Sequence, residues 1–311
     1  MAGTEDQNRS LILGNGFSIK YFSYKTLFAA AKLSTDDPIS RLFGQLKTVD
    51  FEKVVLALEE AAIVEEAYGN VDHAKQLVDD GMSVRRKLVE LVRVTHPGHR
   101  EDIADTIPHC VDFLLPFQKI FTFNYDLLLY WVCLERPKHF KDGFGLGKES
   151  NGFLGPFQSA AHCSIYNLHG GLHLFEQSDG NVAKRIAPHG IIDAIAQSIV
   201  DEKMFPIYVA EGSSQAKMKK INSNAYLRHC YDVVSKIDGV AVIYGHSAAR
   251  NDTHIYRALF SNPKLQHIYF CVHKPTAAID EIDGELARYK TMFGRKLGYT
   301  FVDSETCRIW N

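Results

Sequence analysis

The sequence predicts an α/β protein with a Rossmann-like, doubly wound and mainly parallel sheet. Three observations support this fold class. Short apolar runs alternate with longer segments of helical periodicity, which is the pattern of strands joined by crossover helices. The runs are almost continuously apolar, as expected of strands that are buried on both faces. Small or polar residues directly follow four of the runs, where such folds bind ligands.

Composition narrows the class of protein. The chain has 311 residues, of which 46% are hydrophobic and 23% charged, and its net charge is -2. This balance is typical of a globular protein and gives no sign of a nucleic-acid partner for this chain alone. A compact basic cluster occurs at K217-M-K-K220, which we expect to form a solvated helix face.

The six cysteines lie far apart and include no C-x-x-C pair. This spacing argues against a zinc module or a disulfide scaffold, so we expect buried free thiols and no bound metal. The first ten residues are polar, and no apolar run approaches the ~20 residues that span a bilayer. We therefore expect a cytoplasmic protein with no membrane partner.

The first third of the chain should contain one strand and a block of helices. Residues 11–13 form a short apolar run that ends at Gly14 and Gly16. A helical pattern starts at residue 24 and lasts until residue 115. Because this block separates the first strand from the next, we expect an inserted helical subdomain at 24–115 within a single domain spanning 1–311. Its clearest helices are expected at 51–68, 72–94 and 101–115.

The rest of the chain continues the alternation of strands and helices, with a glycine-rich loop at 142–157 and a polar turn at 178–181. Strands are expected at 119–123, 163–168, 172–175, 206–210, 240–244, 267–272 and 299–302. Helices are expected at 127–135, 190–200, 224–235, 252–260 and 280–293. We find no internal repeat.

Four strand ends carry the candidate site residues, and each has an ordinary alternative explanation. The motifs are G14-N-G-F-S18, T122-F-N-Y-D126, H169-G-G171 and G245-H-S247. The glycines are compatible with simple turns, Asp126 with a helix cap, and His169 with a core histidine. Four such motifs in succession are harder to attribute to chance than any one of them.

In this order, the four motifs resemble those of sirtuin-like NAD-consuming domains, whose pattern is G-A-G-x-S, T-Q-N-x-D, H-G and G-T-S. The match runs from about residue 11 to residue 252. The second and third motifs are the most specific, and they resemble the sirtuin-like domains of bacterial anti-phage defence. The segment at 208–227 also resembles this smaller bacterial branch and differs from the deacylases.

The chain departs from the deacylases in two respects. It lacks their four-cysteine zinc module, and helices at 24–115 replace a short cofactor loop. The resemblance therefore implies NAD+ as substrate without an acyl-lysine acceptor. The implied activity is an NAD+ glycohydrolase that releases nicotinamide and ADP-ribose in abortive anti-phage defence.

The resemblance also implies roles for individual residues. Asn124 would hold the nicotinamide ribose and position the attacking water. Asp126 would fix Asn124 or bind the carboxamide of nicotinamide. His169 would act as general base. The remaining residues would contact the cofactor, with free backbone N–H groups at a helix start suited to the diphosphate. They are Gly14, Asn15, Gly16, Phe17, Ser18, Thr122, Gly245, His246 and Ser247.

Other readings stay open from the sequence alone. The chain could be a subunit that senses NAD or ADP-ribose in a defence complex, or one associated with a nuclease. A sensor needs a phosphate loop but no base, so the pair Asn124 and His169 favours an enzyme. The resemblance further implies a homo-oligomer and an ATPase partner of the HerA type.

Overall fold

The structure is a computed structural model of the chain. It describes residues 8–21, 37–48, 51–187, 189–200, 204, 206–209, 213–273, 276–294 and 296–310. The start of the expected helical pattern, from residue 24 to residue 36, lies outside this part of the chain.

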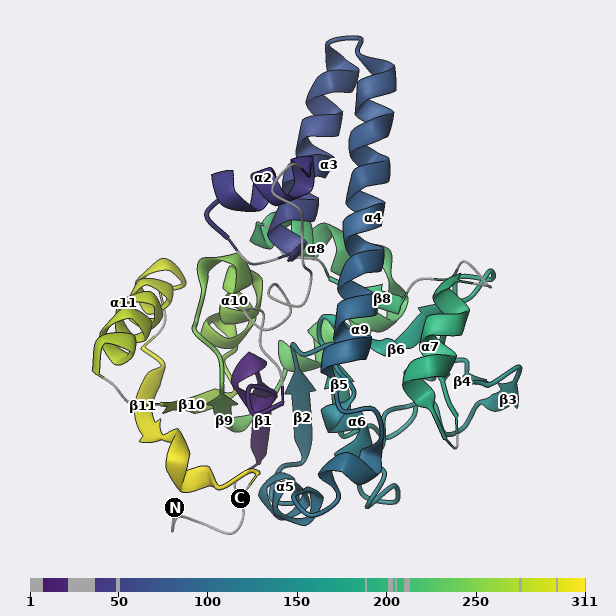
Figure 1. Cartoon of the computed structure of the whole chain (residues 1–311). Helices are drawn as coiled ribbons and strands as arrows, with labels where there is room; N and C mark the ends of the chain where they lie inside the picture. The colour runs from purple at the N-terminus through teal and green to yellow at the C-terminus, as the bar shows by residue number, and fades with distance from the viewer. Residues whose placement is uncertain are drawn as a thin grey trace.

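The centre of the molecule is a parallel sheet of six strands in the order β11-β10-β9-β1-β2-β5 (Figure 1). The expected α/β fold class is thus confirmed. The register pairs Leu11 of β1 with Ile120 of β2 on one side and with Val242 of β9 on the other. The strands are β1 (Arg9–Leu13), β2 (Lys119–Thr122), β5 (Ile165–Asn167), β9 (Gly239–Tyr244), β10 (Leu265–Val272) and β11 (Gly298–Asp303).

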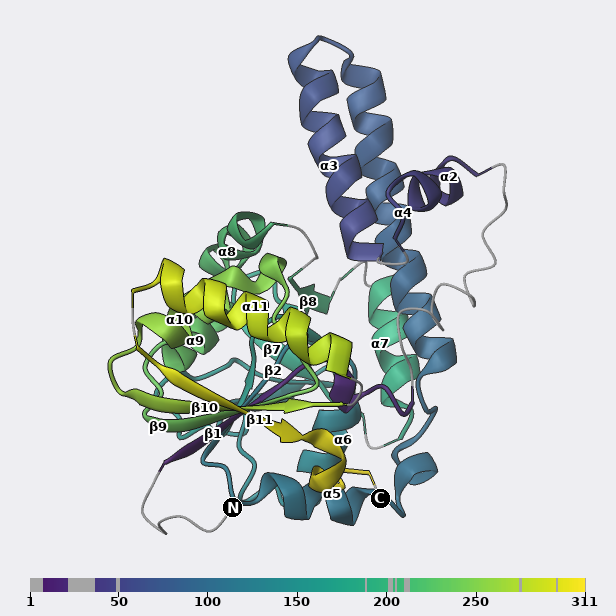
Figure 2. The same ribbon diagram turned by 90° about the vertical axis from the view of Figure 1, so that its left-hand side faces the viewer.

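Alternating side chains of these strands enter two separate hydrophobic cores. Leu11 and Leu13 face a core with α5 and α6, whereas Ile12 faces a core with α9, α10 and α11. Both faces are therefore covered, which explains the nearly continuous apolar runs (Figure 2). The helices are α5 (Ile107–Leu114), α6 (Leu128–Cys133), α9 (Ala225–Val234), α10 (Thr253–Ser261) and α11 (Thr276–Met292).

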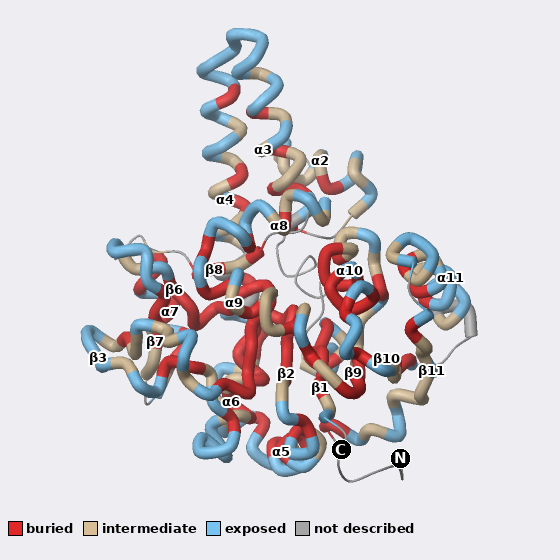
Figure 3. Tube along the Cα trace, turned by 180° about the vertical axis from the view of Figure 1, so that it is seen from behind, coloured by how far each residue is buried: buried red, intermediate tan, exposed pale blue. Residues whose placement is uncertain are grey.

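A group of helices separates β1 from β2. α2 (Pro38–Gln45) begins at Asp37, whose carboxylate accepts a hydrogen bond from the N–H of Ile39. α3 (Phe51–Ala67) and α4 (Val71–Thr95) form a hairpin that projects away from the sheet, and the short helix η2 (Arg100–Ile103) follows. The far end of this hairpin is mostly exposed (Figure 3).

A second, antiparallel sheet contains β3 (Lys148–Ser150), β4 (Phe153–Gly155), β7 (Val182–Arg185), β6 (Gly170–Glu176) and β8 (Pro206–Tyr208), in that spatial order. The prediction of a loop at 142–157 is wrong for part of this segment, because β3 and β4 form a hairpin within it. Its two turn residues, Asn151 and Gly152, both have positive φ, as hairpin turns of this length require. The strand expected at 206–210 exists, but it extends this second sheet.

Two further α-helices flank β8. α7 (Ile191–Val200) precedes β8, and α8 (Ser214–Ser223) follows it. α8 begins at Ser213, whose hydroxyl accepts a hydrogen bond from the N–H of Ala216. Within the described residues, no helix is both long and apolar enough to cross a membrane.

Candidate functional site

The predicted site residues follow β1, β2, β5 and β9, at the carboxyl ends of neighbouring strands. The chain runs from β1 outward through β2 to β5, and then returns to build β9 on the other side of β1. The strand order therefore reverses between β1 and β9. In open α/β sheets this switch point is where ligands bind.

Three glycines fill the switch point with backbone. A Cβ atom at Gly16 would lie 2.4 Å from the Cα of Gly245, and Gly245 itself has a φ of +68°. The N–H of Gly14 donates to Tyr244 O, and the N–H of Gly16 donates to Gly245 O, both at 2.8 Å. The glycines thus allow two loops to touch, and the N–H groups of Gly14 and Gly16 are used within the protein.

The structure after Gly14 also differs from a phosphate-binding helix. Asn15–Phe17 form only a three-residue 3-10 helix, η1, too short for a substantial helix dipole. The N–H groups of Phe17 and Ser18 bond to Gly14 O and Asn15 O. In this conformation the N–H groups of Gly14, Gly16, Phe17 and Ser18 are not available to a diphosphate, and the loop serves to position side chains.

Asn124 is the centre of a buried group that we call the amide network: Ser18, Thr122, Asn124 and Asp126. Asn124 Nδ2 donates to Gly14 O at 3.1 Å and to Ser18 Oγ at 2.9 Å. Because Gly14 O can only accept, these bonds fix which end of the amide is nitrogen. Asn124 Oδ1 is then left buried with no hydrogen-bond partner. A buried acceptor of this kind is a natural contact for a ligand hydroxyl.

Two further hydrogen bonds connect the members of the amide network. Thr122 Oγ1 accepts from the N–H of Asn124 at 3.0 Å, and Ser18 Oγ donates to Asp126 Oδ2 at 2.6 Å. The N-cap residue of α6 is Leu127, but Asp126 Oδ1 accepts from the N–H of Leu128, the first residue of the helix, at 2.8 Å. Asp126 therefore satisfies one free N–H at the helix start and also belongs to the network.

His96, from the end of α4, connects the inserted helices to this site. Its Nε2 accepts from the N–H of Leu127 at 3.2 Å, and its Nδ1 lies 2.9 Å from Pro97 O, so the neutral Nδ1–H tautomer fits both contacts. Burial lowers the pKa of His96. Burial raises the pKa of Asp126, although His96 and the hydrogen bonds from Ser18 and Leu128 act in the opposite direction.

His169 belongs to a second buried group, which we call the histidine cluster: His169, Lys217, His246, Asp252 and His254. Asp252 lies at its centre. Its Oδ1 accepts from Lys217 Nζ at 2.9 Å and lies 3.7 Å from His169 Nε2, while its Oδ2 lies 3.1 Å from His246 Nε2. His169 Nε2 and His254 Nε2 are buried without a hydrogen-bond partner.

The tautomer of His246 follows from its contacts. Its Nδ1 accepts from the N–H of Ala248 at 3.0 Å and lies 2.9 Å from the hydroxyl of Tyr256. Nε2 therefore carries the proton and donates it to Asp252. This arrangement fixes the Asp252 carboxylate against the sheet and makes His246 a support for the cluster.

Charge in the histidine cluster is concentrated on Asp252 and Lys217. Burial by itself would raise the pKa of Asp252, but the hydrogen bond from His246 and the nearby Lys217 charge hold it well below its usual value. Burial, followed by the Lys217 charge, lowers the pKa of His169 well below its usual value. Burial lowers the pKa of His254 to about 4. His169 and His254 are thus neutral beside one ion pair.

Lys217 corrects the prediction of a solvated helix face at 217–220. Its side chain is fully buried and paired with Asp252, whereas Lys219 and Lys220 are exposed. The same pair bears on metal binding. Potential ligand atoms of His169, Asp252 and His254 all lie within 4.8 Å of one another. However, the Lys217 ammonium occupies the position beside Asp252 that a cation would take, so these residues fit a bound metal poorly.

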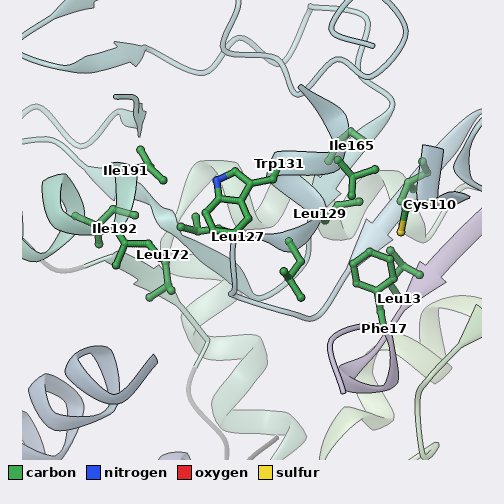
Figure 4. Close-up of a cluster of buried hydrophobic side chains, with 14 of the residues drawn as sticks. Leu13, Phe17, Cys110, Leu127, Leu129, Trp131, Ile165, Leu172, Ile191 and Ile192 are labelled. Atoms are coloured by element: carbon green, nitrogen blue, oxygen red, sulfur yellow. The ribbon is translucent and has the colours of Figure 1, made fainter. Parts of the chain in front are cut away.

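The remaining predicted residues have different positions. Phe17 is part of the hydrophobic core near Leu13 and Cys110 (Figure 4), and its carbonyl accepts from Trp310 Nε1 at 2.6 Å. Asn15 and Ser247 are exposed. Phe123 lies between the two polar groups: in the sequence it is flanked by Thr122 and Asn124 of the amide network, and its ring lies 4.9 Å from that of His169 and 4.5 Å from that of His246 in the histidine cluster.

Fold and site together define a Rossmann-like α/β protein with buried polar groups at the switch point of its parallel sheet. A family model matches residues 11–310, nearly the whole chain, and the chain belongs to this family, which is described as "Domain of unknown function (DUF4917)". A search of curated proteins found no match.

Proposed function

We propose that the protein is an NAD+ glycohydrolase, which cleaves the bond between nicotinamide and ribose. One observation carries the proposal. The amide oxygen Asn124 Oδ1 and the ring nitrogen His169 Nε2 are both buried without a hydrogen-bond partner, and they follow β2 and β5, which are adjacent in the sheet. A ribose hydroxyl can both donate and accept a hydrogen bond, so it suits both atoms. The order of the four motifs, which resembles that of sirtuin-like domains, supports the same substrate.

In the proposed reaction, the bond from the anomeric carbon to the nicotinamide nitrogen breaks, and its electron pair leaves with nicotinamide. The oxygen of a water molecule bonds to the carbon, whose transition state resembles an oxocarbenium ion. His169, neutral because its pKa is lowered, accepts the proton from this water. Asp252, 3.7 Å away, stabilises the imidazolium that forms. Asn124, held by Gly14 O and Ser18, orients the ribose or the water.

The test is release of nicotinamide from NAD+ by the purified protein, measured by chromatography. Asn124→Ala and His169→Gln should each lower turnover at least about 100-fold, the usual contribution of a general base or a positioning group. His173→Gln is the matched control, since His173 is also buried, also has a ring nitrogen without a partner, and lies in the second sheet. It should retain activity. Wild-type activity in both site variants, or no nicotinamide from the unmodified protein, would refute the proposal.

The wider role follows from the same resemblance. We propose that the activity operates in the cytoplasm as anti-phage defence, in a homo-oligomer that also works with a HerA-type ATPase. The hairpin of α3 and α4 supports oligomer formation, because Ile63, Tyr68 and Val71 near its end are 62–83% exposed. Light scattering with size-exclusion chromatography tests this point. A purely monomeric protein at working concentration would contradict it.

A further inference from the structure

A cavity of about 440 Å³ lies between the inserted hairpin and the segment formed by β8 and α8. This volume is within the range of small-molecule sites, roughly 300–1,000 Å³. Leu56 and Glu59 of α3 and Met82 and Arg85 of α4 line one side. The other side is lined by Pro206, Tyr208, Val209, Ala216, Lys217 and Lys220.

The inner wall of this cavity is connected to the proposed general base. Lys217 lines the cavity and bonds to Asp252, which lies 3.7 Å from His169. Val209, also in the wall, donates its N–H to His169 O at 2.9 Å. A ligand in the cavity would therefore lie next to the histidine cluster.

The charge of the lining favours an anion. Three cations, Lys217, Lys220 and Arg85, face one carboxylate, Glu59. Arg85 is paired with Glu59 and Lys217 with Asp252. Lys220 is exposed and has no carboxylate partner among the residues that the structure describes. A phosphate could be bound by Lys220 without breaking an existing ion pair.

We propose that this cavity binds the diphosphate-bearing nucleotide half of the substrate, with Lys220 as a phosphate ligand. This inference rests on the proposed function for the identity of the substrate. It assigns to the inserted hairpin and α8 the task that the resemblance gave to the N–H groups of Gly14 and Gly16, which are used within the protein. The ligand class is a nucleoside diphosphate such as ADP or ADP-ribose.

The experiment measures ADP binding by calorimetry and nicotinamide release in parallel. Lys220→Glu reverses the charge inside the cavity. Lys219→Glu is the matched control, because Lys219 is an exposed neighbour on the same helix that does not line the cavity. Lys220→Glu should weaken ADP binding at least about tenfold, as expected for a charge-assisted hydrogen bond, and Lys219→Glu less than about threefold. Met82→Trp, which places a larger side chain in the cavity lining, should also weaken binding.

The two proposals fail in different ways. ADP binding that depends on Lys220, without nicotinamide release, supports the nucleotide site and refutes the hydrolase. If the protein releases nicotinamide and neither Lys220→Glu nor Met82→Trp changes the KM for NAD+, the hydrolase is supported. The same result overturns the proposal that the cavity binds the substrate. Absence of ADP binding to the unmodified protein also overturns the cavity. Equal weakening by Lys219→Glu and Lys220→Glu reduces the effect to general surface charge and overturns the assignment of Lys220.

Discussion

The amide network and the histidine cluster are two buried polar groups that share Phe123 as a neighbour, yet they are stabilised in different ways. The amide network consists of short side chains that bond to one another and to Gly14 O. The histidine cluster surrounds an ion pair between Lys217 and Asp252. The first is a local product of two strand ends, whereas the second joins α8, the end of β5 and the segment after β9.

The amide network therefore fixes the orientation of side chains, whereas the histidine cluster holds a buried pair of charges. In the amide network, the bonds fix the directions of the Asn124 amide and the Ser18 hydroxyl, and Asn124 Oδ1 is left without a partner inside the protein. In the histidine cluster, burial lowers the pKa of His169 and of His254 and keeps both neutral beside the ion pair, and Nε2 of each has no hydrogen-bond partner. We therefore expect changes in the cluster to affect stability more strongly, and changes in the network to affect it less.

The largest effect on stability is expected from Asp252→Ala. It removes the carboxylate 2.9 Å from the buried Lys217 ammonium, and breaking a buried ion pair on one side typically costs 3–5 kcal/mol. The free energy of unfolding, measured by denaturant titration, should fall by about this amount. The double variant Lys217→Met with Asp252→Leu should cost less than Asp252→Ala alone, because it removes both charges. A loss below about 1 kcal/mol in Asp252→Ala would contradict the central role of the pair.

The same contrast explains how much of this site the sequence could predict. The strand ends were predictable because each is a local apolar run followed by small or polar residues, and Ser18, Asn124 and Asp126 do meet. Lys217 was not, since its burial depends on a partner 35 residues away on another element. The periodicity of apolar residues indicates which face of a helix is buried. It does not reveal a carboxylate on another element that pairs with a lysine of that helix.

Two other features of the structure were not predicted from the sequence, and each has a physical reason. His96 reaches the site from the end of α4 and accepts a hydrogen bond from the N–H of Leu127, 31 residues away in the sequence. No local sequence pattern therefore marks it. The hairpin turn at Asn151 and Gly152 does have a local signal. It was missed because its strands have only three residues each, and those of β3 are all exposed, so no apolar alternation accompanies the turn.

A smaller effect is expected from the pH dependence of the histidine cluster. The pKa of His254 is lowered to about 4 from its usual 6.5, so the unfolded chain binds more protons than the native protein between these values. Stability should therefore fall as the pH drops below 6.5. For this one group the loss between pH 7 and pH 5 is about 2 kcal/mol.

His254→Gln isolates this contribution, because other groups titrate equally in both proteins. Asp126 acts in the opposite direction, since its raised pKa favours the native state as the pH falls. The difference in unfolding free energy between pH 7 and pH 5 should be about 2 kcal/mol smaller in His254→Gln than in the unmodified protein. The same pH dependence in both proteins would show that His254 does not stay neutral in the fold.

The smallest effect is expected from Ser18→Ala in the amide network. It removes the hydroxyl that accepts from Asn124 Nδ2 and donates to Asp126 Oδ2, but Asn124 keeps its bond to Gly14 O. The expected loss is about 1 kcal/mol of unfolding free energy, typical of one hydrogen bond in a network that keeps its other contacts. Turnover of NAD+ should fall further than this loss of stability implies, because the amide of Asn124 loses one of the two contacts that orient it. A loss of several kcal/mol would mean that Ser18 and Asp126 carry as much of the fold as the buried ion pair does, and the contrast between the two groups would disappear.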